Sequence, residues 1–392
     1  MRIGIIAPPW AAIPPVGYGG TEAVIDQLAR GLVSAGHEVV LFTVGESTCP
    51  VDREFLLMVA EGDRIGACVP ELRHVVAAYE AMARANVDII HDHTMAGPVL
   101  ASTPGFIDVP VVTTNHGPFN DELNDVYQRV SQRVGVIAIS QDQARRSRGV
   151  RIAAVIHHGV DPDAFPVGDG GGGYLLFLGR MTAEKGVHRA VQVARATKRP
   201  LLIAAKMREA SEHRYFATQV EPLLGNGIEF VGEVAGDRKL ELIANASALI
   251  NPIRWPEPFG MVMIESLACG TPVLSFREGA ASEIITHGVD GILADTDAEL
   301  VLAAGLGDQL DRGACRAKVL AHFTTAHMVA AHLEVYRARC LRTRGVGVDT
   351  RSFVDVRLPR SILAEGDPFV EPVAMRAFSG SVRPIVGRTR LG

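Results

Sequence analysis

The chain has 392 residues, of which 47% are hydrophobic and 21% charged, and its formal net charge is −5. This length favours two domains of ordinary size, and the composition excludes global disorder because it supplies enough apolar side chains for buried cores. The negative net charge argues against a general nucleic-acid-binding protein, and no apolar run approaches the about 20 residues that a membrane span needs.

The first half of the chain alternates short apolar runs with segments of helical period. A helix is predicted over 21–35, where apolar residues recur every three or four positions, and Gly36 stands where a glycine typically ends a helix. Apolar runs predict buried strands at 2–7, 38–44, 88–91, 109–114, 134–140 and 153–156. This succession predicts a parallel, doubly wound sheet in an N-terminal domain over 1–167.

A glycine-rich segment over 168–173 interrupts the alternation. Asp169 followed by four glycines favours a flexible linker. Beyond it, strands are predicted at 174–178, 201–205, 228–231, 248–252 and 272–275, and helices at 186–196, 238–245 and 260–269. We therefore expect a second doubly wound domain over 174–325. The predicted fold class is α/β, with two Rossmann-like domains that face each other across a cleft.

The C-terminal part differs from both predicted domains. A long amphipathic helix is predicted over 326–341 and is a candidate for crossing back to the first domain. Residues 342–392 are rich in Arg, Pro and Gly, and we expect a surface-wrapping or partly disordered tail. Attraction of this tail to an anionic membrane surface stays open as an alternative, although its charges are scattered rather than clustered.

The cysteines and the N-terminus bear on the cellular compartment. The chain has five cysteines, which is an odd number, and none forms a Cys-x-x-Cys pair. This pattern is typical of reduced thiols rather than of a disulfide framework or a zinc site. The N-terminal run MRIGIIAPPW is too short for a signal peptide, so we expect a cytoplasmic protein.

The motif GYGGTE, residues 17–22, lies between the first predicted strand and the first predicted helix. Glycines allow a substrate to approach the backbone closely, and the start of a helix attracts anions. Glu22 occupies the third glycine position of the G-x-G-x-x-G fingerprint, so a nicotinamide dehydrogenase is disfavoured. A tight turn without a function is the alternative interpretation.

Histidines stand at the ends of two successive predicted strands. His91 and His93 flank Asp92 at the end of one, and His116 follows the next in the motif NHGP, 115–118. Active-site residues stand at such strand ends on this architecture, although a structural role is the alternative for each histidine. A metal site from His91 and His93 lacks a convincing third ligand.

Two cations flank the loop GRMTAEKG, 179–186, directly after the first strand of the second domain. Arg180 and Lys185 beside a helix start suit a diphosphate, since an arginine binds two oxygens at once. Two solvated surface charges are the alternative interpretation.

The segment EPFGMVMIE, 257–265, is the most informative motif. Glu257 and Glu265 bracket a turn and the start of an apolar helix, whose unpaired N–H groups and dipole attract anions. The two carboxylates lie up to roughly 12 Å apart at about 1.5 Å rise per residue. A sugar nucleotide has hydroxyls at both ends and a diphosphate between them, so we infer a nucleotide-sugar glycosyltransferase. An amphipathic helix with incidental glutamates is the alternative.

Together these motifs resemble the retaining glycosyltransferases of family 4, which have the two-domain GT-B fold. The resemblance covers residues 1 to about 340 and also includes DIIHDHT (88–94), AIS (138–140), HHGVDPDAF (157–165), EFVGEV (229–234) and CGTPV (269–273). Thr94 departs from the pattern, because the family often has an acid there.

The resemblance implies a donor site. Glu265 would hold the ribose hydroxyls of the nucleotide, and Glu257 would contact donor-sugar hydroxyls near the anomeric carbon. Arg180 and Lys185 would neutralise the departing diphosphate, so no metal ion is expected. The remaining donor contacts would come from the backbone N–H groups of Gly260, Met261 and Val262, from Gly19 and Gly20 by the phosphates, and from Val231 and Gly232 near the base.

The resemblance also implies the reaction centre and the partners. His116 would lie beside the donor sugar and would act in catalysis with Glu257, Arg180 and Lys185. The acceptor would lie mainly on the first domain, with Tyr18, His91 and His93 on the acceptor side. The nucleotide sugar would be a co-substrate, with no other cofactor, and the acceptor a small molecule, a glycan or a lipid; no nucleic acid partner is expected.

The leading hypothesis is a retaining, metal-independent hexosyltransferase that moves a hexose from a donor of the UDP-glucose or GDP-mannose type to an unidentified acceptor. A GT-B-like sugar-nucleotide epimerase, which needs no acceptor, is one alternative. A non-catalytic protein that binds nucleotide sugars is the other.

Overall fold

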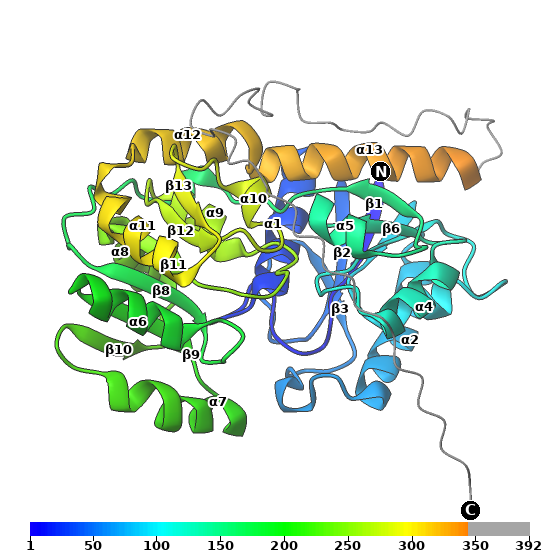
Figure 1. Ribbon diagram of the computed structural model, residues 1–392. Coiled ribbons are helices and arrows are strands. Elements are labelled where there is room, and N and C mark those ends of the chain that lie inside the picture. Colours follow the sequence, from blue (N-terminus) through cyan, green and yellow to red (C-terminus); the bar gives the residue numbers. More distant parts are fainter. Residues whose placement is uncertain (344–392) are drawn as a thin grey trace, which may run out of the picture. The chain divides into compact units, whose positions relative to one another are not determined.

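The computed structural model describes residues 1–343 and contains two parallel sheets that follow each other along the chain (Figure 1). The first sheet has seven strands in the order β3-β2-β1-β4-β5-β6-β7, and the second has six in the order β10-β9-β8-β11-β12-β13. The predicted pair of doubly wound α/β sheets is therefore confirmed. The predicted tail, 344–392, lies outside the described residues.

The first half is built on its seven-stranded sheet. Its strands are β1 (Arg2–Ile6), β2 (Glu38–Thr43), β3 (Asp52–Phe55), β4 (Ile89–Asp92), β5 (Val111–Thr114), β6 (Gly135–Ala138) and β7 (Ile152–Val155). Its helices are α1 (Gly20–Ser34), α2 (Cys68–Arg84), α3 (Gly97–Ala101), α4 (Asp121–Val130) and α5 (Gln141–Arg146), with short 3₁₀ turns η1 (Gly62–Arg64) and η2 (Pro162–Ala164).

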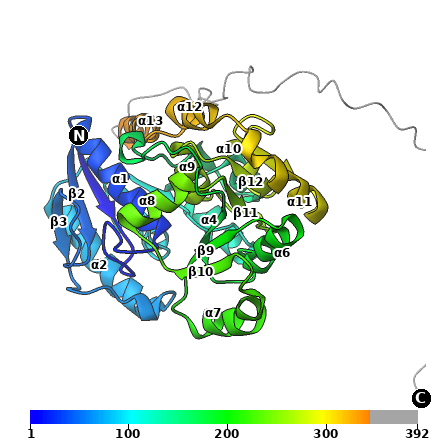
Figure 2. The same ribbon diagram turned by 90° about the vertical axis from the view of Figure 1, so that its left-hand side faces the viewer.

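The second half repeats this plan. Its strands are β8 (Leu175–Arg180), β9 (Leu201–Lys206), β10 (Ile228–Gly232), β11 (Ala248–Asn251), β12 (Val273–Phe276) and β13 (Gly291–Ala294). Its helices are α6 (Val187–Thr197), α7 (Ala210–Tyr215), α8 (Gly236–Asn245), α9 (Met261–Ala268), α10 (Ala281–Ile284), α11 (Asp297–Leu306) and α12 (Arg312–His322), with short turns η3 (Phe216–Val220), η4 (Glu221–Leu223) and η5 (Gly307–Gln309). On one face of this sheet, α6 and α11 pack side by side (Figure 2).

Each sheet is covered on both faces, which explains why its strands are near-continuous apolar runs. In β1, Ile3 and Ile5 belong to one core cluster, and Ile6 belongs to the cluster on the opposite face. Successive side chains of a strand point to opposite faces, so one short run contributes to both cores. β3 was not predicted because this edge strand exposes most of its residues and lacks an apolar run.

The last helix, α13 (Thr325–Thr343), packs against the first half of the chain (Figure 1). Met328, Val329 and Leu333 join the core cluster that contains β1 and α1 residues. Gly31 of α1 permits the close approach, because a Cβ there would lie 2.6 Å from the Val329 side chain. The chain thus returns to its first half after completing the second.

The glycine-rich segment 168–173 is hydrogen-bonded to the second half. The N–H groups of Gly168, Gly170 and Gly172 donate to the carbonyls of Cys269, Ala244 and Asn245. The Arg312 guanidinium donates to the Gly168 carbonyl at 2.7 Å. These bonds hold the segment against the second half in this structure.

The carboxylate of Glu283, in the second half, forms hydrogen bonds with the first half. Glu283 of α10 accepts hydrogen bonds from the N–H groups of Gln141 and Asp142, at the start of α5, and from His157 Nε2, at 2.7–2.8 Å.

Among residues 1–343, no helix combines the length and the apolar composition needed to cross a bilayer. No disulfide joins the five cysteines, all of which lie in this described part.

Candidate active site

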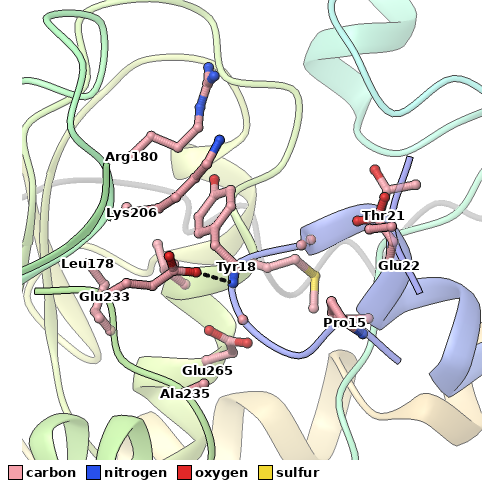
Figure 3. A pocket seen from close by; sticks show the side chains of 18 of the residues that line it. Pro15, Tyr18, Thr21, Glu22, Leu178, Arg180, Lys206, Glu233, Ala235 and Glu265 are labelled. Carbon is pink, nitrogen blue, oxygen red and sulfur yellow. Dashed lines mark hydrogen bonds between the residues drawn. The ribbon is translucent and has the colours of Figure 1, made fainter. Parts of the chain in front are cut away.

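A cavity of about 940 Å³ lies between the two halves (Figure 3). The second half lines it at the carboxyl ends of its strands, with Arg180 at the end of β8, Lys206 at the end of β9 and Asn251 at the end of β11. The first half contributes the loop after β1 and the start of α1. Ligands of open α/β sheets bind at such strand ends, so this cavity is the candidate active site.

The turn before α9 points the start of that helix at the cavity. Gly260 has φ +96°, a left-handed conformation that favours glycine, and it directly precedes the first residue of α9. Gly279 supports the turn from behind, because a Cβ there would collide with the backbone of Glu257. The predicted donor residues Gly260, Met261 and Val262 all line the cavity.

Lys185 and Glu257 form an ion pair within the cavity. Lys185 Nζ lies 2.6 Å from both carboxylate oxygens of Glu257, and the two side chains are only 12% and 16% exposed. The ammonium group also lies 5.7 Å from the Trp255 ring centroid. The structure therefore brings together two predicted catalytic residues that are 72 positions apart.

Glu265 of α9 pairs with a lysine that the sequence did not single out. Its Oε1 accepts from Lys239 Nζ of α8 at 2.7 Å. Its Oε2 is buried and has no hydrogen-bond partner in the described part of the chain. An unpaired buried carboxylate oxygen in a cavity is an acceptor available to a ligand.

Arg180 differs from the other cations of the cavity. Lys185, Lys239, Lys206 and Arg208 each have a carboxylate within 3.1 Å. For Arg180, no carboxylate partner exists among residues 1–343. Its guanidinium is therefore the cation most available to an anionic ligand.

Tyr18 extends from the glycine loop to the opposite wall. Figure 3 shows its ring reaching towards Arg180 and Lys206. Partial enclosure, and then the negative charge of Glu257, raise the pKa of Tyr18 to about 12. Its backbone N–H donates to Glu233 Oε1 at 2.9 Å. Tyr18, predicted on the acceptor side, thus contacts the second half.

The backbone of Gly17, Gly19 and Gly20 lines the cavity beside Tyr18. A Cβ at Gly17 would meet the ends of the Glu233 and Arg208 side chains, which would have to move to make room for it. Arg208 donates to the Glu233 carboxylate at 2.6 Å. The glycine loop therefore contacts the Arg208–Glu233 ion pair of the second half.

The predicted histidines occupy different depths. His116 lines the cavity, and its Nε2 lies 2.8 Å from His93 Nδ1 behind it. His91 is fully buried and does not line the cavity, because its nitrogens bond the Tyr336 and Thr114 hydroxyls. Burial lowers the pKa of His116 to about 3, and it lowers the pKa values of His91 and His93 well below the usual range.

His158 lines the cavity although the sequence analysis did not select it. Its ring stacks on that of His116, with centroids 5.3 Å apart. His158 lies in the motif HHGVDPDAF, in the loop between β7 and η2. Its position directly after a strand is the sequence signal that could have indicated a site residue.

Val231 and Gly232, the two residues predicted to lie near the base, do not reach the cavity. They lie in β10, whereas residues 233–236 line the cavity. Val231 packs against the core, and Gly232, with φ +81°, ends the strand. The loop that follows β10 is consequently the part that reaches the cavity.

Within the described residues, no group of three or more His, Cys, Asp or Glu side chains has the arrangement to hold a metal ion. Among the same residues, five cationic side chains line the cavity: Arg180, Lys185, Lys206, Arg208 and Lys239.

Two family models match consecutive parts of the chain. Residues 18–164 match "Glycosyltransferase Family 4", and residues 166–317 match "Glycosyl transferases group 1". Among curated relatives, glycogen synthase of Mycobacterium tuberculosis is 26% identical over 397 residues, covering 83% of this chain and 92% of that protein. Phosphatidyl-myo-inositol mannosyltransferase of Mycolicibacterium smegmatis is 28% identical over 348 residues, covering 80% and 87%.

A solved structure shares the fold. Anabaena HepE in complex with UDP-glucose superposes with a TM-score of 0.69 at 18% identity, covering 86% of this chain and 100% of that chain. The two sheets, the cavity at their strand ends and the matched family models agree with each other. The chain belongs to the glycosyltransferases of family 4, with the GT-B fold.

Proposed function

We propose that this glycosyltransferase moves a hexose from a nucleotide-diphosphate sugar to an acceptor hydroxyl, with retention of configuration and without a metal ion. One arrangement carries the proposal. Glu265, the start of α9 and the Lys185–Glu257 pair succeed one another along one wall of the cavity, together with the unpaired Arg180. Acidic acceptors for ring hydroxyls thus flank a cationic, N–H-rich centre for a diphosphate.

Each group has a role that fits its surroundings. The unpaired Oε2 of Glu265 accepts from a ribose hydroxyl, and Glu257 accepts from hydroxyls of the donor sugar. The N–H groups at the start of α9 and the Arg180 guanidinium bind the diphosphate. His116, at the cavity wall, lies beside the donor sugar.

The reaction separates charge, and the cavity stabilises the negative charge that develops on the diphosphate. The acceptor oxygen forms a bond to the anomeric carbon while the bond from that carbon to the phosphate oxygen breaks, and its electron pair leaves with the diphosphate. The acceptor oxygen attacks the face of the sugar from which the diphosphate leaves, which retains the configuration, and its proton passes to a diphosphate oxygen on that face. Arg180 and Lys185 stabilise the negative charge that develops, a role that a metal ion has in other transferases.

The donor class rests on the comparison with HepE, which binds UDP-glucose. We propose UDP-glucose ahead of GDP-mannose for this chain. A reducing compartment, the cytoplasm, agrees with five cysteines that form no disulfide in the described residues.

Product analysis tests the proposal. The full chain is incubated with UDP-glucose or GDP-mannose and candidate sugar acceptors, with and without EDTA, and nucleoside diphosphate release and the anomeric configuration of the product are measured. We expect an α-linked product and the same rate in EDTA. A β-linked product overturns retention, and loss of rate in EDTA overturns metal independence. Release of nucleoside diphosphate without any glycoside product favours an epimerase.

A further inference from the structure

The two walls of the cavity differ in charge. Every Lys and Arg side chain that lines the cavity belongs to the second half. The wall supplied by the first half, within residues 1–343, contains no Lys or Arg but three carboxylates: Glu22, Asp26 and Asp63. The diphosphate of a donor is thus matched by one wall alone.

The start of α1 is the one element of the first-half wall that would attract an anion, and Glu22 already occupies it. A Cβ on Gly19, the residue before α1, would lie 2.9 Å from Glu22 Oε2, so the carboxylate lies over the helix start (Figure 3). Burial raises the pKa of Glu22, and its interaction with its own backbone N–H opposes that rise. A second anion at this position would meet a carboxylate instead of free N–H groups.

Asp26 adds an acceptor at the same wall. It is 8% exposed, and its Oδ2 accepts from Arg30 at 2.8 Å. Its Oδ1 is buried and accepts from no N–H or O–H group in the part of the chain that the structure describes, although the Cys49 thiol interacts with the same carboxylate. A hydroxyl or ammonium group of a ligand can donate to such an oxygen, whereas a fully ionised phosphate has no hydrogen to donate.

Apolar side chains accompany these carboxylates. Trp10, Val16 and Ile65 line the cavity on the first-half side. Val16 is 91% exposed and Ile65 is 67% exposed. A sugar ring presents C–H faces as well as hydroxyls, so carboxylates beside an indole and aliphatic groups match both parts of it.

We propose that the acceptor is a polyhydroxylated molecule, uncharged or amine-bearing, that places no phosphate or carboxylate in the cavity. This inference rests on the proposed function, because it assigns the substrate of the same reaction. Hydroxyls donate to the carboxylates of Glu22, Asp26 and Asp63, and an ammonium group is stabilised by them. A phosphate on the acceptor is repelled by the same groups and finds no cation on this wall. The acceptor thus differs in charge from the phosphatidyl-myo-inositol for which one relative is named.

Matched acceptor series test the inference. The full chain is given UDP-glucose or GDP-mannose with glucose, glucosamine and glucose 6-phosphate, with myo-inositol and inositol 3-phosphate, and with maltotriose and its 6-phosphate. Nucleoside diphosphate release above the acceptor-free rate and the mass of the product are measured. We expect kcat/KM for the uncharged or amine-bearing member to exceed that for its phosphorylated partner by about tenfold or more.

Asp63→Lys is the specificity variant, because Asp63 is exposed on η1 and makes no described contact on which folding depends. We expect this variant to lower the ratio of kcat/KM for the unphosphorylated acceptor to kcat/KM for its phosphorylated partner. Glu22→Gln, which preserves the shape of the side chain, is expected to lower this ratio as well. Glu122→Lys, an exposed position of α4 outside the cavity, is the control for the same charge change and is expected to leave the ratio as it is.

The outcomes separate the inference from the proposed function. A phosphorylated member that is the better acceptor overturns the inference, as does an unchanged ratio in Asp63→Lys. Donor binding or hydrolysis with no transfer to any uncharged or amine-bearing member also counts against it. Absence of nucleotide-sugar binding by calorimetry instead removes the proposed function itself.

Discussion

Lys185 Nζ lies 2.6 Å from both carboxylate oxygens of Glu257, so the cation expected to stabilise a leaving diphosphate is neutralised by the carboxylate expected to contact the sugar. The pair is largely buried, which strengthens the attraction. In the proposed complex, a donor would place its diphosphate near Arg180 and near this ammonium group. The ammonium is thereby held in position before the negative charge develops, as preorganised stabilisation requires.

The first prediction concerns Lys185→Ala. Loss of a donor that acts chiefly on developing charge is expected to lower kcat by roughly 10²–10³ while nucleotide affinity changes much less. Steady-state kinetics and calorimetry with the nucleoside diphosphate measure the two effects. Lys198→Asn, at the opposite end of α6, is the control, since Asn tolerates the left-handed conformation found there. Wild-type turnover in Lys185→Ala would remove this residue from the mechanism.

A second prediction concerns Glu265→Ala. The variant removes the unpaired Oε2 and leaves Lys239 without its partner, so the ribose hydroxyls lose their acceptor. Hydrogen bonds to charged groups contribute about 1.5–3 kcal/mol, so we expect the Kd for the nucleotide to rise about tenfold or more. Glu241→Ala is the matched control, because Glu241 lies on α8 in an exposed ion pair. Equal nucleotide affinity in the variant and the wild type would refute the role of Glu265.

A third prediction concerns the tautomer of His116. Burial keeps both His93 and His116 neutral, so their bond of 2.8 Å needs one N–H. His93 Nε2 is buried and has no hydrogen-bond partner in the described residues. An unprotonated nitrogen at this position destabilises the folded state less than a buried N–H without an acceptor would. The proton therefore lies on His93 Nδ1, and His116 carries its own on Nδ1.

Nitrogen-15 NMR of histidine-labelled protein measures this tautomer. We expect His116 as the Nδ1–H form in the wild type and a shift towards the Nε2–H form in His93→Phe, together with a kcat that is lower by roughly tenfold. Phe preserves a ring in contact with that of His91, whose centroid lies 4.0 Å from that of His93. His213→Phe, at an exposed position, is the control. An unchanged His116 spectrum in His93→Phe would show that His93 has no positioning role.

A fourth prediction concerns stability in acid. Burial lowers the pKa of five histidines that pack around the floor of the cavity: His91, His93, His116, His158 and His332. In the unfolded chain these groups titrate near about 6.5, so below this pH the unfolded state binds more protons than the folded state. The contribution of these histidines to the free energy of unfolding is present in full above about pH 6.5, and the free energy of unfolding falls as the pH decreases towards about 4.

Three carboxyl groups act in the opposite direction. Burial raises the pKa of Asp92 to about 6 and also raises the pKa values of Glu22 and Asp290, so the folded state gains stability as these groups take up protons, but they are three groups against five. Urea unfolding at several pH values between 7.5 and 5 measures the slope. His332→Gln is expected to reduce the slope of the free energy of unfolding against pH by about one proton. Equal stability across this range would contradict the prediction.

The sequence by itself determined the alternation of strands and helices, and most of the residues that it predicted for the site line the cavity. Buried parallel strands are apolar runs, and glycines with special conformations, such as Gly260, are recognisable locally. Arg180, Lys185, Glu257 and Glu265 were predicted because each stands at a strand end or a helix start. These signals depend on neighbours in the chain, which the sequence contains directly.

Only the tertiary structure decided which of these groups meet. Lys185 pairs with Glu257 across 72 positions because β8 and β11, whose following loops contain them, are neighbours in the second sheet. Lys239 of α8 pairs with Glu265 of α9 across 26 positions. His91 is buried in the first half, where it bonds Tyr336 of α13. The separation of charge between the two walls has a similar origin, since neither half contains the cavity alone. Contacts between distant segments follow from how sheets and helices stack, and no local pattern of residues encodes that arrangement.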